Sequence, residues 1–263
     1  MNRVDKARLR ESFSARASGY AGAAPLQREV AERAAAAALQ AVPFPRSILD
    51  VGCGPGGLLA ALEGARPGAA VTGVDLAPGM VREAAQRAPR ARLAVGDAEA
   101  LPFAAGSFDL VLSTSTFQWL PRLDAALAEV RRVLSPGGTL VLALFGAETL
   151  VELRSSWAAS APVAAAGTHR FPSEQEVGTA LHTAGLAVRT LGAEHRVEWH
   201  DSPRDLLRSL REIGAGNAVP GRAGGLGLRR AVLGMERAYV ERHGRDGRVP
   251  ATWEIVTATA QRP

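Results

Sequence analysis

The chain has 263 residues, of which 47% are hydrophobic and 22% charged, and its formal net charge is +5. These proportions are those of an ordinary folded protein and exclude a disordered chain, and no apolar stretch approaches the ~20 residues of a membrane-spanning helix. The single cysteine excludes an internal disulfide, and no two histidines have the spacing of a helical metal site, so we expect no metal centre.

Residues 5–41 are expected to form helices, because Leu26, Val30 and Ala34 recur at helical spacing and two prolines follow. We therefore expect residues 1–45 to be an N-terminal helical cap. The first twenty residues are charged and lack the apolar run of a secretory signal, which indicates a cytoplasmic protein.

Strand and helix patterns alternate through residues 46–145, the predicted core. Each strand pattern is a short apolar run, and most of them precede a helical pattern. Such alternation predicts a parallel sheet with helices on both faces. The expected strands are 47–51, 70–75, 91–95, 108–113 and 139–145, and the expected helices begin near Leu58 and cover 78–88 and 123–134.

The rest of the chain is expected to complete the same sheet. After an irregular stretch to about residue 172, helices are predicted at 173–184, 203–213 and 226–242, and strands at 186–199 and 251–260. The fold class is therefore α/β, with a Rossmann-like seven-stranded sheet that is mostly parallel, has one antiparallel strand and carries helices on both faces and a helical cap. The glycine-rich segment 214–227 is expected to be a mobile loop, and its action as a lid stays open.

The first strand leads into a turn of small residues. Asp50 precedes Gly52, Gly54 and Gly56, and the absence of side chains lets the backbone approach a ligand closely. The spacing differs from the G-x-G-x-x-G of a dinucleotide loop. A carboxylate before the turn suits a ligand with an amino-acid end, because it accepts hydrogen bonds from an ammonium group.

Two more acids follow the next strand patterns. Asp75 ends the second strand, where a carboxylate can accept both hydroxyls of a ribose. Asp97 follows the third strand, where it is expected to accept the exocyclic amine of an adenine ring that Leu76 and Met80 contact. The three strand ends together predict a site for an adenosyl ligand.

These residues resemble the class I S-adenosylmethionine-dependent methyltransferases, and the match covers about residues 46–145. The motifs are Asp50-x-Gly-x-Gly-x-Gly56, Asp75, Gly96-Asp97-Ala98, Phe108-Asp-Leu-Val111 and Leu134-Ser-Pro-Gly-Gly138. The resemblance implies that S-adenosylmethionine is the cofactor and S-adenosylhomocysteine the product. It further implies a cofactor site made of Tyr20, Asp50, Gly52, Gly54, Gly56, Asp75, Leu76, Met80, Asp97, Ala98, Ser113 and Phe117. By the same resemblance, the stretch from Ser113 to Phe117 lines the opening at which the methyl group is transferred.

A narrower resemblance, to the malonyl-[acyl-carrier-protein] O-methyltransferases of biotin synthesis, extends over nearly the whole chain. It rests on Phe13-x-x-x-Ala17-x-x-Tyr20, Leu26-Gln-Arg28, Gln118-Trp119, Thr149-Leu150, Arg170-Phe171, Ser209–Gly216 and Arg248–Glu254. It implies one methyltransferase domain over 1–263, in which 46–145 binds the cofactor and 146–263 supplies substrate-cap insertions and the final strands. Val249 departs from the family, which often has an aromatic residue at this position.

The implied reaction, an early step of biotin (pimeloyl) synthesis, methylates the free carboxylate of malonyl-acyl-carrier protein. That carboxylate is anionic at pH 7, so no catalytic acid or base is required. Arginine binds both carboxylate oxygens, which makes Arg170 or Arg222 the candidate clamp. Acyl carrier protein is acidic, and the arginines at 204, 208, 211, 229 and 230 are either its docking face or solvated surface.

Other interpretations stay open. A methyltransferase of a free carboxylic acid or a quinone precursor would have the same first half, and a catalytically silent subunit would bind the same cofactor. A nicotinamide-dependent oxidoreductase is disfavoured by the position of the third glycine, and a nucleic-acid-binding protein by an aromatic content of only 5%. We expect a monomer without nucleic-acid or membrane partners, in which Tyr20 either covers the cofactor or packs between helices.

Overall fold

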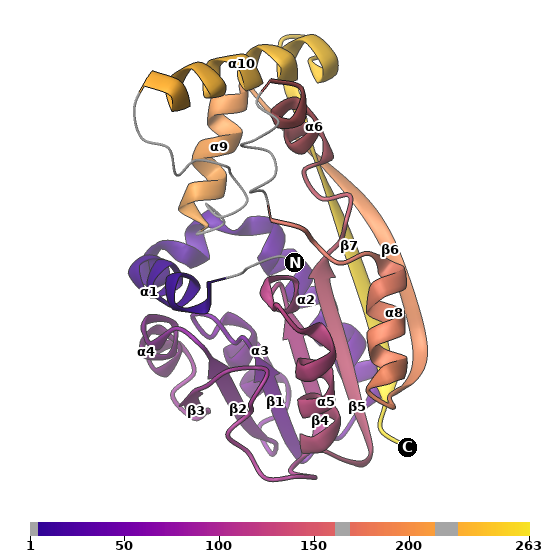
Figure 1. Cartoon of the computed structure of the whole chain (residues 1–263). Coiled ribbons are helices and arrows are strands. Elements are labelled where there is room, and N and C mark those ends of the chain that lie inside the picture. The colour runs from indigo at the N-terminus through magenta and orange to yellow at the C-terminus, as the bar shows by residue number, and fades with distance from the viewer. Residues whose placement is uncertain (1–4, 161–168, 214–225) are drawn as a thin grey trace.

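The computed structural model describes residues 5–160, 169–213 and 226–263, and one sheet of seven strands runs through the part it describes (Figure 1). The strand order is β3-β2-β1-β4-β5-β7-β6. The strands are β1 (Ser47–Val51), β2 (Ala70–Asp75), β3 (Arg92–Val95), β4 (Phe108–Thr114), β5 (Leu134–Phe145), β6 (Ala187–His200) and β7 (Val249–Gln261).

Strand directions confirm the predicted fold class. β1 to β5 pair in parallel, whereas β7 lies antiparallel to both β5 and β6. Parallel neighbours require crossovers, and helices supply them. β5 begins at Leu134, five residues before the predicted 139, because Leu134 already pairs with Phe108 ahead of an irregularity in the register.

Helices cover both faces of the sheet. α2 (Pro25–Ala41), α3 (Gly57–Ala65) and α4 (Pro78–Arg87) pack on one face, and α5 (Leu123–Val133) and α8 (Glu174–Thr183) on the other. Successive residues of a strand point to opposite faces, so Ile48 joins one core cluster and Leu49 the other. Continuous apolar runs are expected of strands that are buried on both faces.

The remaining helices gather beyond one end of the sheet, toward the top of Figure 1. α1 (Lys6–Ala23) packs on α4 and α9, while α10 packs on α6 and α9. α6 (Val151–Ser160) follows β5, and α9 (Pro203–Glu212) follows β6, which places this cap at the carboxyl ends of the parallel strands. α10 spans Leu226–His243, and a single helical turn, η1 (Phe117–Trp119), follows β4.

Helix α6 corrects the expectation of an irregular stretch from 146 to about 172. Its buried residues are Glu152, Leu153, Ser156 and Trp157, a helical spacing that its polar members conceal in the sequence. The hydroxyls of Ser155 and Ser156 donate to the carbonyl of Glu152 inside the helix. Of the helices in the described ranges, none combines the length and the apolarity needed to cross a bilayer.

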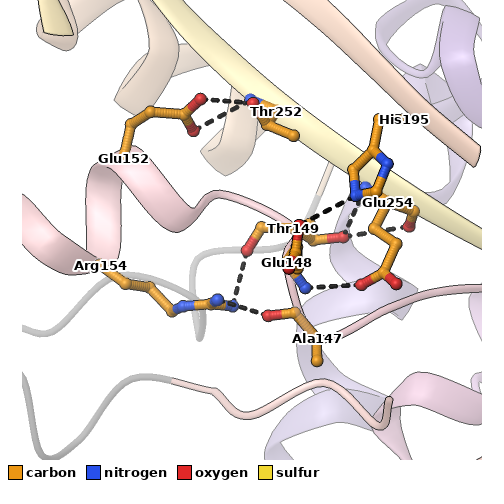
Figure 2. A network of polar contacts seen from close by, with 8 residues as sticks. All are labelled: Ala147, Glu148, Thr149, Glu152, Arg154, His195, Thr252 and Glu254. Atoms are coloured by element: carbon orange, nitrogen blue, oxygen red, sulfur yellow. Dashed lines mark hydrogen bonds and ion pairs between the residues drawn. The ribbon is translucent and has the colours of Figure 1, made fainter. Parts of the chain in front are cut away.

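A network of polar contacts fixes the start of the cap to the sheet (Figure 2). The Glu254 carboxylate on β7 accepts from the backbone N–H of Glu148 at 2.6 Å, and Arg154 donates to the carbonyls of Ala147 and Thr149. Glu152 accepts from the backbone N–H of Thr252 at 3.1 Å and from its hydroxyl. The loop between β5 and α6 is therefore held on β7 at several points.

Replacing Thr252 by Val tests the strength of this attachment. The variant keeps the side-chain shape but removes the hydroxyl that donates to Glu152. A hydrogen bond to a charged, partly buried group contributes about 1.5–3 kcal/mol, so the free energy of unfolding should fall by about that amount in urea titrations. Thr257→Val is the matched control, since Thr257 lies exposed on the same strand; equal effects of the two substitutions would contradict this role of the network.

Candidate functional site

The turn after β1 has its shape because two glycines lie where a side chain would collide with a neighbour. Gly52 has φ of +79°, its N–H donates to the Val74 carbonyl at 2.7 Å, and a β-carbon there would overlap Thr116. Gly56 has φ of +82°, and its β-carbon would lie 2.7 Å from the Cα of Ala84 on α4. Positive φ and close approach both favour glycine, so the turn is tied to its neighbours.

A cavity of about 470 Å³ opens above this turn. Its floor comes from the carboxyl ends of β1 to β4, and its roof from α1 and α2. In open α/β sheets ligands bind at this edge, and the volume is within the range of small-molecule sites, about 300–1,000 Å³. Of the predicted cofactor residues, the lining includes Tyr20, Asp50, Gly52, Gly54, Asp75, Leu76, Met80, Asp97 and Ala98.

Asp50 has the most unusual environment in the cavity. Its carboxylate is 1% exposed, and the Oδ1 oxygen has no hydrogen-bond partner. Burial, together with the nearby Asp75 carboxylate, raises the pKa of Asp50 to about 8. A buried acceptor without a partner is costly, and it indicates a position for an external donor.

Asp75 is held by the same turn. One carboxylate oxygen accepts from the N–H of Gly54 at 2.9 Å and the other from the N–H of Ala77 at 2.8 Å. Burial raises the pKa of Asp75, and the two backbone hydrogen bonds oppose that shift. Each oxygen keeps a lone pair for a further donor, as a pair of ribose hydroxyls would require.

Asp97 has protein partners that the sequence did not reveal. Its Oδ2 lies 2.6 Å from Nζ of Lys6 on α1, and its Oδ1 accepts from the N–H of Glu99 at 3.0 Å. Lys6 also lies 2.8 Å from the Glu99 carboxylate. Burial lowers the pKa of Lys6, but the hydrogen bonds to Asp97 and Glu99 outweigh that effect and leave it raised. The ion pair holds α1 over the cavity.

Three predicted cofactor residues do not line the cavity. The hydroxyl of Ser113 donates to the Val51 carbonyl at 2.7 Å, and Phe117 is 1% exposed within the core. Gly56 serves the packing of α3 against α4. Within the stretch Ser113 to Phe117 that was expected to line the site, the residues that line the cavity are Thr114, Ser115 and Thr116.

Of the two arginines proposed as a clamp, the structure describes only Arg170, which is not among the residues that line the cavity. Arg170 is exposed, and its guanidinium donates to the Glu176 carboxylate at 2.7 Å. Arg222 and most of the glycine-rich segment 214–227 lie outside the described residues. In the part of the chain that the structure describes, the basic residues that line the cavity are Lys6, Arg28 and Arg87.

A smaller chamber of about 20 Å³ adjoins the cavity. Both spaces share Phe13, Tyr20, Gln27, Ser115 and Trp119 in their linings, so these residues form the boundary. Beyond the boundary the chamber is lined by Gln118, Phe145, Leu150, Phe171, Leu210, Ile213 and Trp253. The sequence had marked Phe13, Gln27 and Gln118 only as parts of family motifs, because residues from separate elements do not reveal a shared chamber.

The residues present fit S-adenosylmethionine. The unpartnered Oδ1 of Asp50 suits an ammonium group, Asp75 has free lone pairs for ribose hydroxyls, and Leu76 and Met80 offer apolar contact to a base. Among the described residues, no three His, Cys, Asp or Glu side chains are arranged to hold a metal ion. Burial raises the pKa of Tyr20 to about 12, with a further contribution from Asp75, so the Tyr20 phenol at the boundary stays neutral.

The fold and this cavity define a class I methyltransferase. A family model described as a methyltransferase domain matches residues 49–142. The geranyl diphosphate C-methyltransferase of Streptomyces coelicolor, solved with S-adenosyl-L-homocysteine, has the same fold with a TM-score of 0.53 and 18% identity, over 88% of this chain and 79% of that one.

Relatives that match over nearly the whole chain show which family of methyltransferases it belongs to. The malonyl-[acyl-carrier protein] O-methyltransferase of Geobacter sulfurreducens is 42% identical over 98% of this chain and 100% of its own length. The protein of the same name from Halorhodospira halophila is 39% identical over 96% of this chain and 86% of its own length. The chain belongs to the malonyl-[acyl-carrier protein] O-methyltransferase family.

Asp50→Asn tests the ligand-binding role of the buried carboxylate. Because the pKa of Asp50 is raised to about 8, binding of an ammonium group at pH 7 must ionise it and release a proton. Calorimetry with S-adenosylhomocysteine in buffers of different ionisation enthalpy should detect nearly one proton released by the unaltered protein and none by the variant. The variant's dissociation constant should rise by about tenfold or more, since charge-assisted hydrogen bonds are strong.

The same substitution should stabilise the ligand-free protein. The folded state keeps the Asp50 proton to higher pH than the unfolded state, so its stability falls as the pH rises from about 4, near the usual pKa of aspartate, toward 8. The melting temperature of Asp50→Asn should therefore exceed that of the unaltered protein increasingly up to pH 8. Asp109→Asn, at the opposite end of the sheet, is the control; proton release that survives in Asp50→Asn would refute the assignment.

Proposed function

We propose that the chain transfers the methyl group of S-adenosylmethionine to the free carboxylate of malonyl-acyl-carrier protein, an early step of biotin synthesis. The observation that carries this proposal is the similarity over nearly the whole chain to malonyl-[acyl-carrier protein] O-methyltransferases, with 42% identity to the Geobacter sulfurreducens protein. The cavity, whose lining suits an adenosyl ligand, supports it. The similarity covers 98% of this chain and so includes the cap as well as the cofactor core.

The lining of the cavity agrees with this chemistry. The cofactor supplies a sulfonium-bound methyl group, which bonds to a carboxylate oxygen as its bond to sulfur breaks, with no proton transferred. No histidine lines either chamber among the described residues, and a carboxylate that is already ionised needs no base. The protein's task is to align the groups and to exclude water, which the helices α1 and α2 above the cavity are placed to do.

The cap carries a candidate surface for an acidic carrier protein. Leu206, Leu207 and Leu210 of α9 are buried, and its arginines lie on the opposite side. Arg204 pairs with Glu236 at 2.7 Å and Arg208 with Asp205 at 2.9 Å, so part of their charge is balanced locally. Leu210 also lines the small chamber, so the helix that carries these arginines borders that chamber. Arg229 and Arg230 at the start of α10 are exposed.

We further propose a monomer that acts in the cytoplasm. The cavity is closed by helices of the same chain, and the carrier-bound substrate is expected in the cytoplasm.

Methyl transfer to malonyl-carrier tests the function directly. Incubation with labelled S-adenosylmethionine should give a methyl ester on the malonyl group, detected by mass analysis of the intact carrier. Free malonate and a quinone precursor serve as competing acceptors. Transfer to either of these at a rate equal to or above that of malonyl-carrier, or no transfer to the carrier, would overturn the proposal.

Charge reversal on α9 tests the docking surface. Arg208→Glu with Arg211→Glu should raise KM for malonyl-carrier by about tenfold at low salt, because like charges repel the acidic partner. The effect should shrink as salt screens the charges, and KM for S-adenosylmethionine should not change. Arg92→Glu with Arg189→Glu, on the two edge strands, is the matched control; an equal rise in KM from that pair would contradict a local docking site.

A further inference from the structure

The boundary between the cavity and the small chamber contains a strained residue. Ser115 follows β4 and has φ of +53°, a left-handed conformation that is unfavourable for residues with a side chain. Its N–H is fixed by a hydrogen bond of 2.9 Å to the Ala143 carbonyl on β5. Strain of this kind persists where surrounding structure enforces it, and it concentrates at functional sites.

Two polar side chains at this place lack partners. The hydroxyl oxygen of Ser115 and the Oε1 oxygen of Gln118 are both buried without a hydrogen bond, and Gln118 is only 3% exposed. Both residues line the small chamber, whose remaining lining is mainly aromatic and aliphatic. Native proteins rarely leave such groups unsatisfied, so the pair indicates a position for a polar group of a ligand.

No charged side chain lines this chamber in the described residues. His169 stacks on Trp119, a wall of the chamber, with ring centroids 4.6 Å apart, and its Nε2 donates to the backbone carbonyl of Gln118 at 2.7 Å. Burial lowers the pKa of His169, with the Arg154 charge acting in the same direction, so the ring is neutral at pH 7. Among the described residues, a negatively charged group in the chamber would meet neutral side chains only.

A neutral lining suits the reaction proposed above. Before transfer a carboxylate faces a sulfonium cation, and after transfer both charges are gone. In a low-dielectric space the two opposite charges stabilise one another without an added cation. An arginine there would be left as an uncompensated buried charge once the ester forms, which is costly. Hydroxyl and carboxamide donors orient the carboxylate without this penalty.

We propose that Ser115 and Gln118 bind the acceptor carboxylate through neutral hydrogen-bond donors, the Ser115 hydroxyl and the Gln118 carboxamide, an assignment that rests on the function proposed above. The carboxamide presents its N–H₂ after a half-turn about its last bond, since its two ends have nearly the same shape. Tyr20 and Trp119 form the walls beside them. This pair is an alternative to the clamp expected of Arg170 or Arg222, and Arg222 lies outside the described residues.

The test compares two ligands that have nearly the same shape and differ in the charge of their terminal group. Malonyl-pantetheine carries the carboxylate, and acetoacetyl-pantetheine has nearly the same shape with a neutral methyl ketone. Their dissociation constants are measured by tryptophan fluorescence with protein loaded with sinefungin, whose protonated amine supplies a cation at the position of the transferable methyl group. The unaltered protein should prefer malonyl-pantetheine, and Ser115→Gly and Gln118→Leu should each reduce that preference by about tenfold.

Ser115→Gly keeps the test interpretable, because glycine adopts positive φ without strain. It removes the hydroxyl and should melt no lower than the unaltered protein. Ser156→Ala is the matched control, since Ser156 is a buried serine on α6 whose hydroxyl donates to the Glu152 carbonyl at 2.7 Å, away from both chambers. The control should keep the full preference for malonyl-pantetheine.

The outcomes separate this inference from the proposed function. If the unaltered protein methylates malonyl-carrier but the two variants keep the ligand preference, the carboxylate pair is wrong and the function stands. If no methyl transfer to malonyl-carrier occurs, the function fails, and the binding comparison still decides whether this chamber selects a carboxylate. Equal affinity of the unaltered protein for both ligands would overturn the inference in either case.

Discussion

The site depends on one costly arrangement, a carboxylate buried without a partner at the end of the first strand. Asp50 lies at the centre of a parallel sheet, where β2 and β4 exclude water on both sides. The turn that follows needs glycines at positive φ, and it brings Asp75 close enough to raise the pKa of Asp50 further. Such a group destabilises the empty fold and favours a cationic ligand, so binding relieves a cost that folding imposes.

The helices of the cap also hold a small chamber against this site. The chamber is lined by residues of α1, α2, η1, α9, β5 and β7, which lie far apart in the sequence. The Glu254 and Glu152 contacts in Figure 2 attach the loop before α6 to β7, and Leu150 of that loop lines the chamber. Rigid attachment matters because methyl transfer relies on alignment more than on acid or base groups.

The sequence predicted the sheet and the cofactor side because both follow from local patterns. Apolar runs, glycine turns and acids at strand ends are periodic or adjacent in the chain, and they located Asp50 and Asp75 correctly on the cavity. The pattern is less informative where position depends on packing. Helix α6 was missed because two of its buried residues, Glu152 and Ser156, are polar. The sequence also could not show that Ser113 donates to the Val51 carbonyl or that Arg170 pairs with Glu176. Ser115 lies within the stretch Ser113 to Phe117 that was expected to line the site, but its strain and missing partner are visible only in three dimensions.

A crystal structure of the protein with S-adenosylhomocysteine is the most direct measurement of the central claim. The ligand's ammonium group should lie within hydrogen-bond distance of Asp50 Oδ1, and its ribose hydroxyls should donate to the Asp75 carboxylate. An amino-acid end placed elsewhere, with Asp50 still lacking a partner in the bound state, would contradict it.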